Sequence, residues 1–409
     1  MVRESWDLAV IGGGAAGMAA AIAASDLGDR VVLIEKSSFL GKKITASGNG
    51  RCNLMNLREP VYYGDSGFAK DVLESFGRED LRRFWNGLGL CLSEETEGRI
   101  YPSTFQSASV LDALKTRLKA NRVEIFLQTP VRGFSPEDNI FRIDCGENAF
   151  FAKRVIVATG GPASPKLGGT DDGYRLLKEF GHTIIPAAPA LCPLVTDKRS
   201  VSGLSGIRCR CGISLYGPDG TLLHTEKGEV LFTDSGISGI CAMQCARFVQ
   251  EGCRAELDLV ERIFPDNQTL FAALKERREK AGEFPPETVC TGFLLPKLAF
   301  AVLKQAGIEM RGRTAGDLKD EELKAIAERV HHYSLQVTGT RGLEEAQVTA
   351  GGAECAEFDP STMESRLKSG LHAAGEVLNV DGDCGGFNLM FVFASGILAG
   401  RNGRKGEQP

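Results

Sequence analysis

The sequence predicts an α/β protein in which both chain ends form a Rossmann-like dinucleotide-binding domain. A β-barrel-like domain with a small helical subdomain is expected to be inserted between them. A glycine cluster at 12–17 separates an apolar run from an alanine-rich segment. A similar pattern of an apolar run, glycines and a helical segment returns after about residue 370, whereas the middle of the chain has short apolar runs separated by glycines. Such runs are typical of antiparallel sheets and small barrels.

The chain has 409 residues, which suggests two to three domains at about 150 residues each. We place the dinucleotide-binding domain at 1–186 and 351–409. The inserted domain, which we expect to hold the substrate, spans 187–350, with its helical part at about 267–331.

Composition excludes several classes of protein. Lys and Arg number 48 against 53 Asp and Glu, a net charge of -5, whereas nucleic-acid binders usually carry a basic excess. The 43% of hydrophobic residues is enough for sizeable cores and argues against disorder. The 49 glycines show no collagen period, so they are expected in turns and close backbone contacts.

The twelve cysteines include no CxxC pair, so we expect reduced, mostly buried thiols and no metal site. Residues 8–25 carry no charge, but they contain four glycines and follow acidic residues. They therefore do not resemble a signal peptide or a membrane span. A soluble cytoplasmic protein without membrane partners is expected.

The first part of the chain reads as a βαβ unit followed by alternating helices and strands. Strands are expected at 6–11 and 30–35, where short apolar runs end at glycine or an acid, with a helix of small residues at 15–27 between them. Further helices are predicted at 69–86 and 107–120. Apolar, β-branched runs predict strands at 123–127, 141–145 and 154–158.

The inserted domain is expected to begin with strands, at 191–196, 207–215 and 229–233. Helices follow at 267–281 and 296–331, where Pro296 suits a first helical turn. His331 and His332 come after a charged helix and are expected at the surface. The last part returns to a strand at 371–378 and a helix at 388–401.

The strongest motif is the GxGxxG pattern of residues 12–17 between a strand and a helix. Gly12 permits a tight turn, Gly14 lets a pyrophosphate approach the backbone, and Gly17 allows close helix–strand packing. The N–H groups and dipole at the helix start favour phosphate. Glu35 ends the second strand, where its carboxylate can accept from ribose hydroxyls. From this unit we assign Gly12, Gly14, Ala15, Ala16, Gly17, Glu35 and Lys36 to a dinucleotide.

A second region, 41–53, is dense in glycine, hydroxyl groups and cations. Such a loop can pass beside a pyrophosphate and ribityl chain, with Lys43 and Arg51 offsetting negative charge. For Cys52 a packing role is favoured over a redox one, because no resolving cysteine is near in sequence. The residues assigned here are Lys43, Ser47, Gly48, Arg51, Cys52 and Asn53.

Two further elements favour FAD over NAD as the bound dinucleotide. The strand VIVATGG ends in Thr159 and Gly160, as in flavoproteins with two dinucleotide domains. Near the C-terminus an acid follows a strand end, where ribityl hydroxyls can be held, and a glycine pair opens the last helix, whose N–H groups can stabilise a reduced flavin. The residues assigned from these segments are Thr159, Gly160, Gly375, Glu376, Gly386, Phe387 and Asn388, and Val131 is assigned to the cofactor as well.

Together these motifs resemble a bacterial flavoprotein family that includes the aminoacetone oxidases and the bile-acid 4,6-dienone reductase of gut anaerobes. The matching blocks include IGGGAAGMAAAIAA, GKKITASGNGRCN, GEVLFTDSGISG and GEVLNVDGDCGGFNL, and they span residues 8–400. The resemblance implies FAD in the terminal domain and a barrel-like insert. This chain departs from the family at Thr233-Asp234 and at 387–391, so a relative's substrate does not carry over directly.

The resulting expectation is an FAD-dependent oxidoreductase. No second GxGxxG follows a strand in the insert. Either NADH or NADPH therefore visits the substrate pocket as a transient electron donor, or the electrons come from the substrate or another protein. The resemblance and the apolar Phe387, Met390 and Phe391 favour reduction of a carbon–carbon double bond in a steroid-like enone, such as a 3-oxo-4,6-diene bile-acid intermediate. An amine oxidase that releases hydrogen peroxide and an RNA-binding flavoprotein are the alternatives. Asp234 is a speculative proton donor, although a turn or helix cap is its favoured interpretation.

Overall fold

The computed structural model describes residues 5–404 and divides the chain into two compact units. Unit 1 comprises 1–189 and 347–409, and unit 2 comprises 190–346. The outermost residues of the expected terminal domain, 1–4 and 405–409, lie outside the described part of the chain.

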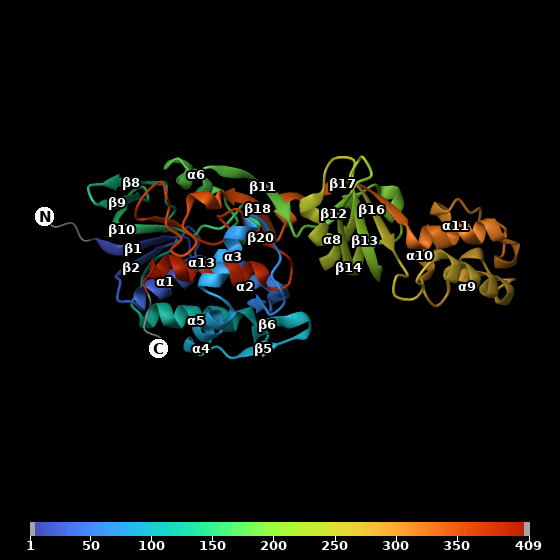
Figure 1. Cartoon of the computed structure of the whole chain (residues 1–409), viewed down its shortest axis with the longest axis horizontal. Helices are drawn as coiled ribbons and strands as arrows, with labels where there is room; N and C mark the ends of the chain where they lie inside the picture. Colours follow the sequence, from blue (N-terminus) through green and yellow to red (C-terminus); the bar gives the residue numbers. More distant parts are fainter. Residues whose placement is uncertain (1–4, 405–409) are drawn as a thin grey trace. The chain divides into compact units, whose positions relative to one another are not determined.

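Unit 1 contains a seven-stranded sheet with the order β7-β2-β1-β10-β9-β8, and β19 pairs with β10 (Figure 1). Strands β7, β2, β1, β10 and β19 run parallel, whereas β9 and β8 are antiparallel additions at one side. These strands are β1 (Trp6–Ile11), β2 (Val31–Ile34), β7 (Glu124–Phe126), β8 (Gly133–Glu137), β9 (Ile140–Asp144), β10 (Ala149–Val157) and β19 (Leu371–Ala373). The inner strands are buried along most of their length, as parallel strands covered on both faces should be.

Helices and smaller strand pairs complete unit 1. The helices are α1 (Ala15–Ser25), α2 (Lys42–Ala46), α3 (Ser66–Ser75), α4 (Arg78–Gly87), α5 (Ser107–Ala120), α6 (Asp172–Lys178) and α13 (Phe387–Arg401). The small strands are β3 (Met55–Asn56), β4 (Tyr62–Gly64), β5 (Leu92–Glu94), β6 (Arg99–Pro102) and β20 (Val380–Gly382). Strands β11 (Ile184–Ala190) and β18 (Val348–Ala353) pair where the chain leaves and re-enters unit 1.

Helices α1 and α13, from opposite ends of the sequence, pack against each other (Figure 1). A Cβ at Gly396 would lie 2.5 Å from the Ala16 carbonyl oxygen, and one at Gly400 would lie 2.3 Å from that of Ala20. The glycines therefore let the two backbones touch, and the C-terminal helix becomes part of the same core as the first βαβ unit.

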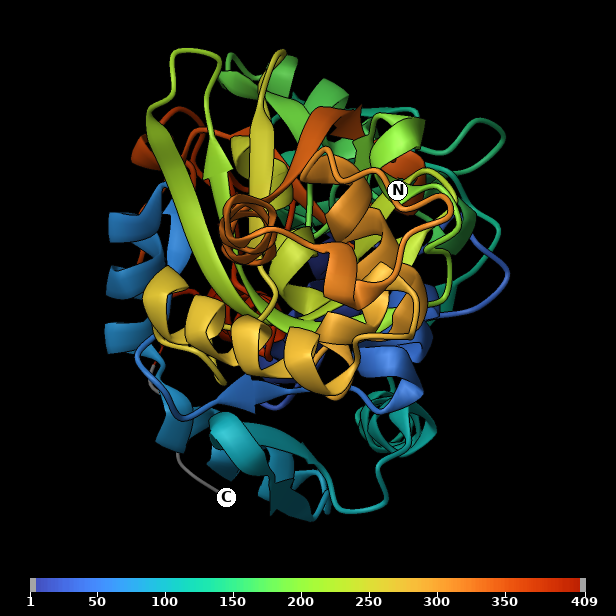
Figure 2. The ribbon, with the colours of Figure 1, turned by 90° about the vertical axis from the view of Figure 1, so that its right-hand side faces the viewer.

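Unit 2 is a closed barrel with the strand order β12-β15-β14-β13-β16-β17. Figures 1 and 2 show its helices α9, α10 and α11 in yellow and orange, and α11 packs on both α9 and α10. The strands are β12 (Leu194–Thr196), β13 (Arg208–Tyr216), β14 (Leu222–Thr233), β15 (Gly236–Ser238), β16 (Arg254–Asp258) and β17 (Tyr333–Thr340). The helices are α7 (Lys198–Val201), α8 (Ile240–Gln244), α9 (Asn267–Lys280), α10 (Pro296–Gln305), α11 (Asp320–His331) and α12 (Gly342–Glu345). The α/β fold class with a barrel is thus confirmed.

Three predicted elements are wrong in extent. The helix expected at 69–86 is two helices, because Gly77 caps a new one and donates its N–H to Asp80. The helix expected at 296–331 is likewise interrupted between α10 and α11, a stretch that contains Gly307 and Gly312. The strand expected at 371–378 ends at Ala373, since Gly375 adopts a positive φ of 80° that breaks the extended backbone.

The prediction that His331 lies at the surface is also wrong. His331 is 8% exposed, and its Nδ1 lies 3.1 Å from both carboxylate oxygens of Asp258 at the end of β16. It shares the inward face of α11 with Ala327, four residues earlier, and this face packs on β16. His332, one residue further, is exposed as expected.

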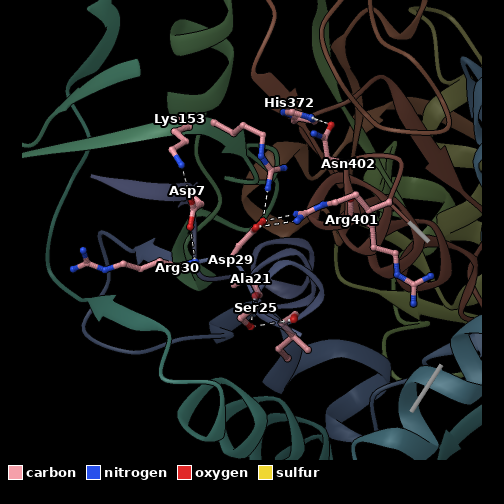
Figure 3. Close-up of polar contacts among 12 residues, drawn as sticks. Asp7, Ala21, Ser25, Asp29, Arg30, Lys153, His372, Arg401 and Asn402 are labelled. Carbon is pink, nitrogen blue, oxygen red and sulfur yellow. Dashed lines mark hydrogen bonds and ion pairs between the residues drawn. The ribbon is translucent and has the colours of Figure 1, made fainter. Parts of the chain in front are cut away.

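At the amino end of β1 and the adjoining residues of β10, a polar network ties the chain's last described residues to the sheet (Figure 3). Asp29 accepts hydrogen bonds from Arg154 and Arg404, and Asp7 accepts from Lys153 and from the backbone N–H of Arg30. These contacts lie at the amino end of β1, whereas α1 begins beyond its carboxyl end. Among residues 5–404, no helix combines the length and apolar character needed to cross a membrane.

Candidate cofactor site

The carboxyl ends of the parallel strands meet at one edge of the unit 1 sheet, which is where ligands bind in folds of this kind. Gly12 follows β1, Glu35 follows β2, Thr159 comes two residues after β10, and Gly375 comes two residues after β19. The register of the strands therefore brings together segments that are separated by up to about 360 positions in the sequence.

The three motif glycines differ in what surrounds them. Gly12 has a φ of 108°, and a Cβ there would lie 2.5 Å from the Ala158 carbonyl oxygen. A Cβ at Gly17 would lie only 1.9 Å from the carbonyl oxygen of Gly12, whereas a Cβ at Gly14 would meet nothing within 4 Å. Packing thus explains Gly12 and Gly17, and the open space at Gly14 is what an approaching pyrophosphate needs.

Glu35 ties the glycine turn to the end of β2. Its Oε2 accepts from the backbone N–H of Gly13 at 2.6 Å, and its Oε1 accepts from that of Ser37 at 2.7 Å. An ionised carboxylate has about four lone-pair sites, so acceptor capacity remains for ribose hydroxyls. The two backbone bonds hold the carboxylate at the sheet edge before any ligand binds.

A small pocket, partly open to solvent, lies at this edge. Lys36 and Asp172 form an ion pair of 3.0 Å between two of its lining residues. Among the residues assigned from the sequence, the pocket is lined by Gly12, Glu35, Lys36, Val131 and Thr159. Sequence reasoning missed Thr129, Pro130, Gly168, Thr170 and Asp172, although the turn-forming TP pair directly before Val131 was a usable signal.

Lys43, predicted to offset negative charge on a dinucleotide, is paired with a carboxylate of the protein itself. Its Nζ lies 2.9 and 3.0 Å from the two carboxylate oxygens of Glu376, so these two assigned residues form an ion pair. Glu376 Oε1 also accepts from the backbone N–H of Thr349 at 3.0 Å. The structure therefore brings the two predicted ligands together from distant segments, with Lys43 neutralised by a carboxylate.

The loop after α2 combines surface and core residues. Ser47 donates from Oγ to the Ile44 carbonyl, and Gly48 is exposed. The Arg51 guanidinium lies over the rings of Tyr101 and Phe105, at 4.3 and 4.8 Å. The cation predicted to face phosphate or flavin thus rests on aromatic faces.

Cys52, next along this loop, is fully buried. Burial raises the pKa of its thiol to about 11, because an apolar environment disfavours the thiolate. A thiol that stays protonated suits packing rather than redox chemistry.

The start of α13 lies against residues 53–56. Gly386 has a φ of 109°, and a Cβ there would lie 2.6 Å from the Met55 carbonyl oxygen and 2.7 Å from Asn53 Oδ1. This Asn53 oxygen is buried and has no hydrogen-bond partner among the described residues. The Asn388 amide is already engaged, since Nδ2 donates to the Gly382 carbonyl and Oδ1 accepts from the Gly382 N–H.

Phe387, Met390 and Phe391 are 5%, 1% and 2% exposed and belong to the core of unit 1. The expectation that they form an apolar surface for substrate is therefore not supported, because the inward face of α13 uses them for packing. Asp234 is exposed in the turn between β14 and β15 of unit 2, in agreement with its favoured interpretation as a turn residue.

The residues at the sheet edge fit FAD. The open backbone at Gly14 and the start of α1 suit a pyrophosphate, and Glu35, which lines the neighbouring pocket, suits a ribose. The unpartnered Asn53 oxygen, next to Gly386, is an acceptor that an N–H of a ligand can satisfy.

In FAD-dependent oxidoreductases of this fold, the dinucleotide lies along this edge of the sheet, and backbone from the C-terminal part of the chain lies beside it. The protein is an FAD-dependent oxidoreductase. The match to a protein-family model identifies its family. A family model described as "HI0933-like protein Rossmann domain" matches residues 6–402, and the chain belongs to this family. The resemblance seen in the sequence motifs is thereby confirmed.

Several characterised proteins are similar to this chain over most of their length. The 3-dehydro-bile acid delta(4,6)-reductase of Clostridium scindens is 35% identical over 404 residues, which cover 96% of this chain and 98% of the relative. The ribosomal RNA dihydrouridine synthase of Escherichia coli is 28% identical over 400 residues, or 96% of each chain. The crystal structure of 3-ketosteroid delta1-dehydrogenase from Sterolibacterium denitrificans matches with a TM-score of 0.52 and 12% identity, covering 98% and 99% of the two chains, and it supports the fold alone.

Proposed function

We propose that the protein is an NAD(P)H-linked, FAD-dependent reductase of a carbon–carbon double bond conjugated to a carbonyl. The substrate would be a small, mostly apolar enone, with a 3-oxo-4,6-diene bile-acid or related steroid intermediate as the first candidate. The observation that carries this proposal is the 35% identity to a bile-acid delta(4,6)-reductase over nearly the whole of both chains. Reduction of a ring double bond also connects it to the second relative, because dihydrouridine is uridine with one ring double bond reduced.

When bound, FAD supplies the hydride. The chain's own residues bind and orient it. The N–H groups at the start of α1 would hold the pyrophosphate beside Gly14, and the remaining lone pairs of Glu35 would accept from the ribose. The ion pair of Lys43 with Glu376 fixes both side chains between α2 and the segment after β19. Their mutual neutralisation avoids an isolated charge in a half-buried place.

NADH or NADPH is proposed as the electron donor, visiting transiently, since the sequence contains no second dinucleotide motif after a strand. Such a donor and the chain's twelve free cysteines suit a reducing compartment, so we propose that the protein works in the cytoplasm.

The proposal is tested with reduced enzyme. The purified yellow protein is reduced under argon with NADH or NADPH and mixed with a 3-oxo-4,6-diene steroid. We expect the oxidised flavin band to return and the product to gain two hydrogens by mass spectrometry. In aerated buffer without acceptor, slow reoxidation is expected. Fast reoxidation with peroxide formation, accelerated turnover with aminoacetone and no steroid product would instead identify an amine oxidase.

An RNA substrate is the second candidate function. Two relatives carry the name ribosomal RNA dihydrouridine synthase, the second from Haemophilus influenzae at 29% identity over 401 residues, covering 94% of this chain and 95% of the relative. The net charge of -5 speaks against a long phosphate-contacting surface. Incubation of reduced enzyme with unmodified ribosomal RNA, followed by nucleoside mass spectrometry, distinguishes the candidates. Dihydrouridine without steroid product would replace the enone proposal.

A further inference from the structure

Four of the twelve cysteines gather in the barrel of unit 2. Cys209 and Cys211 lie on β13, and their Sγ atoms are 3.9 Å apart. Residues two apart on a strand point to the same face, and here this is the face that carries the buried Ile213 and Leu215. Cys211 is buried, whereas Cys209, nearer the start of the strand, is half-buried. The pair therefore has an inner thiol and an outer thiol.

Of the other two cysteines, Cys241 lies on α8 and Cys245 directly follows this helix. Gly228 lies opposite Cys211 on β14, and a Cβ at Gly228 would lie 3.4 Å from Cys241 Cβ and 3.7 Å from its Sγ. Cys245 donates from Sγ to the Cys241 carbonyl at 3.4 Å. Gly228 thus leaves room for a third thiol beside Cys211, and Cys209 is the member of the group that solvent reaches.

The four thiols differ in how readily they ionise. The hydrogen bond with Cys211 lowers the pKa of Cys209, although burial and the carboxylate of Glu229 oppose this. The same bond, together with burial, raises the pKa of Cys211. Burial raises the pKa of Cys241 to about 12, and that of Cys245 also lies above its usual value. Cys209 is therefore the thiol of this group that ionises most readily.

We propose that Cys209 and Cys211 are a peroxide-reactive dithiol, with Cys209 as the attacking thiol and Cys211 as the resolving thiol. The Cys209 sulfur attacks a hydroperoxide, the O–O bond breaks, and Cys209 sulfenic acid and one molecule of water form when hydrogen peroxide is the oxidant. The Cys211 sulfur then displaces the sulfenic oxygen as a second water, which forms the disulfide. Two thiols lose two electrons and two protons, and one peroxide is reduced to two waters.

The geometry favours a reversible reaction. The sulfurs must approach from 3.9 Å to the ~2.05 Å of a disulfide. This requires adjustment of a strand that is paired with β14 at both cysteines and with β16 from Gly212 onward. A disulfide under such constraint is more easily reduced than a relaxed one. Among residues 5–404, no three His, Cys, Asp or Glu side chains are placed to hold a metal ion.

The experiment uses the intact FAD-loaded protein without turnover, so its outcome is separate from that of the enone assay. The protein is treated with a small molar excess of hydrogen peroxide, its remaining thiols are alkylated under denaturing conditions, and the peptides are weighed. We expect free thiols to fall from twelve to ten per chain. The loss should be confined to the peptide of Cys209 and Cys211, which loses two hydrogen masses and is restored by dithiothreitol.

Cys91 is the internal control, because it is an exposed thiol in unit 1. Cys209 should react with peroxide faster than Cys91, because its hydrogen bond with Cys211 lowers its pKa and so raises its thiolate fraction. In Cys211→Ser a sulfenic acid should persist on Cys209 and be trapped by dimedone. In Cys209→Ser, Cys211 should remain unmodified.

Two results would overturn the assignment. One is oxidation of Cys91 in the wild-type protein while the Cys209–Cys211 peptide stays reduced. The other is equal dimedone labelling of Cys209 in the wild-type protein and in Cys211→Ser, which would show that Cys211 resolves nothing. The wild-type result does not depend on the folding of any variant.

Discussion

At the level of single residues, the site depends on glycines that differ in how much space their neighbours leave for a side chain. Gly17 is needed because a Cβ would overlap the Gly12 carbonyl oxygen, whereas Gly14 has empty space beside it. The same sequence motif thus contains one glycine required by the protein's own packing and one that is left open for a ligand. Substitution should separate these two roles.

Gly14→Ala and Gly17→Ala form a matched pair for this test. Gly14→Ala should leave the apoprotein's free energy of unfolding nearly unchanged and weaken FAD binding at least tenfold, because the new methyl group occupies the pyrophosphate's approach. Gly17→Ala should lower the free energy of unfolding of the apoprotein by about 3 kcal/mol. Flavin titration and urea unfolding of the apoproteins measure both effects. Equal unfolding curves for the two variants would contradict the distinction.

At the level of elements, the core of unit 1 depends on two helices that touch through small residues. Gly396 and Gly400 of α13 face the backbone of α1 at Ala16 and Ala20, so the helix that begins at the sheet edge is supported along its length by the C-terminal helix. Overpacking of such a contact forces the backbones apart.

Gly400→Ala should therefore lower the free energy of unfolding by about 1–3 kcal/mol. Gly87→Ala in α4 is the control, since a Cβ at Gly87 meets nothing within 4 Å. In this variant alanine's better helix propensity should leave stability equal or raise it by about 0.5–1 kcal/mol. Chemical denaturation of both variants measures the contrast, and a destabilised Gly87→Ala variant with a normal Gly400→Ala variant would refute it.

An ion pair at the start of α11 predicts that the stability of unit 2 depends on pH. Arg313 donates to both carboxylate oxygens of Glu322, at 2.7 and 2.8 Å, and the backbone N–H of Lys319 also donates to it. The Arg313 bonds, opposed by partial burial, lower the pKa of Glu322 from 4.5 to about 2. Because the folded-state pKa is depressed, the stabilisation is complete above the unfolded value and is lost as the pH falls from about 4.5 to about 2.

Glu322→Gln should remove this contribution, so that stability falls less steeply over that pH range than in the wild-type protein. Glu321→Gln, at the exposed neighbouring position, should retain the wild-type slope. Urea unfolding at a series of pH values measures the slopes. If Glu322→Gln and the wild-type protein had parallel profiles, the Arg313 pair would not be the source.

At the level of the whole molecule, the two ends of the chain build unit 1 and the intervening segment builds a closed barrel with its own core. The cofactor residues discussed above all lie in unit 1. A ligand that binds only the folded state raises the stability of the part that binds it.

Saturation with FAD should therefore stabilise unit 1 selectively, by about 2.7 kcal/mol at a free concentration of 100 Kd. Calorimetry of the apoprotein with increasing FAD should move the transition that includes unit 1 to higher temperature, and hydrogen exchange should show the added protection in β1, α1 and β10. Protection confined to the barrel strands of unit 2 would contradict the assignment of the site.

The amino-acid sequence by itself determined the βαβ unit, the glycine turn, the acid at the end of the second strand, the barrel-like insert and the family, because these depend on local periodicity and on motifs within a few dozen residues. Only the tertiary structure decided what distant residues do to one another. It paired Lys43 with Glu376, placed Arg51 on Tyr101, buried His331 against Asp258 and turned the apolar residues of α13 into the core. Side chains find partners by position in space, and sheet order and helix packing bring together positions hundreds of residues apart, which no local pattern records.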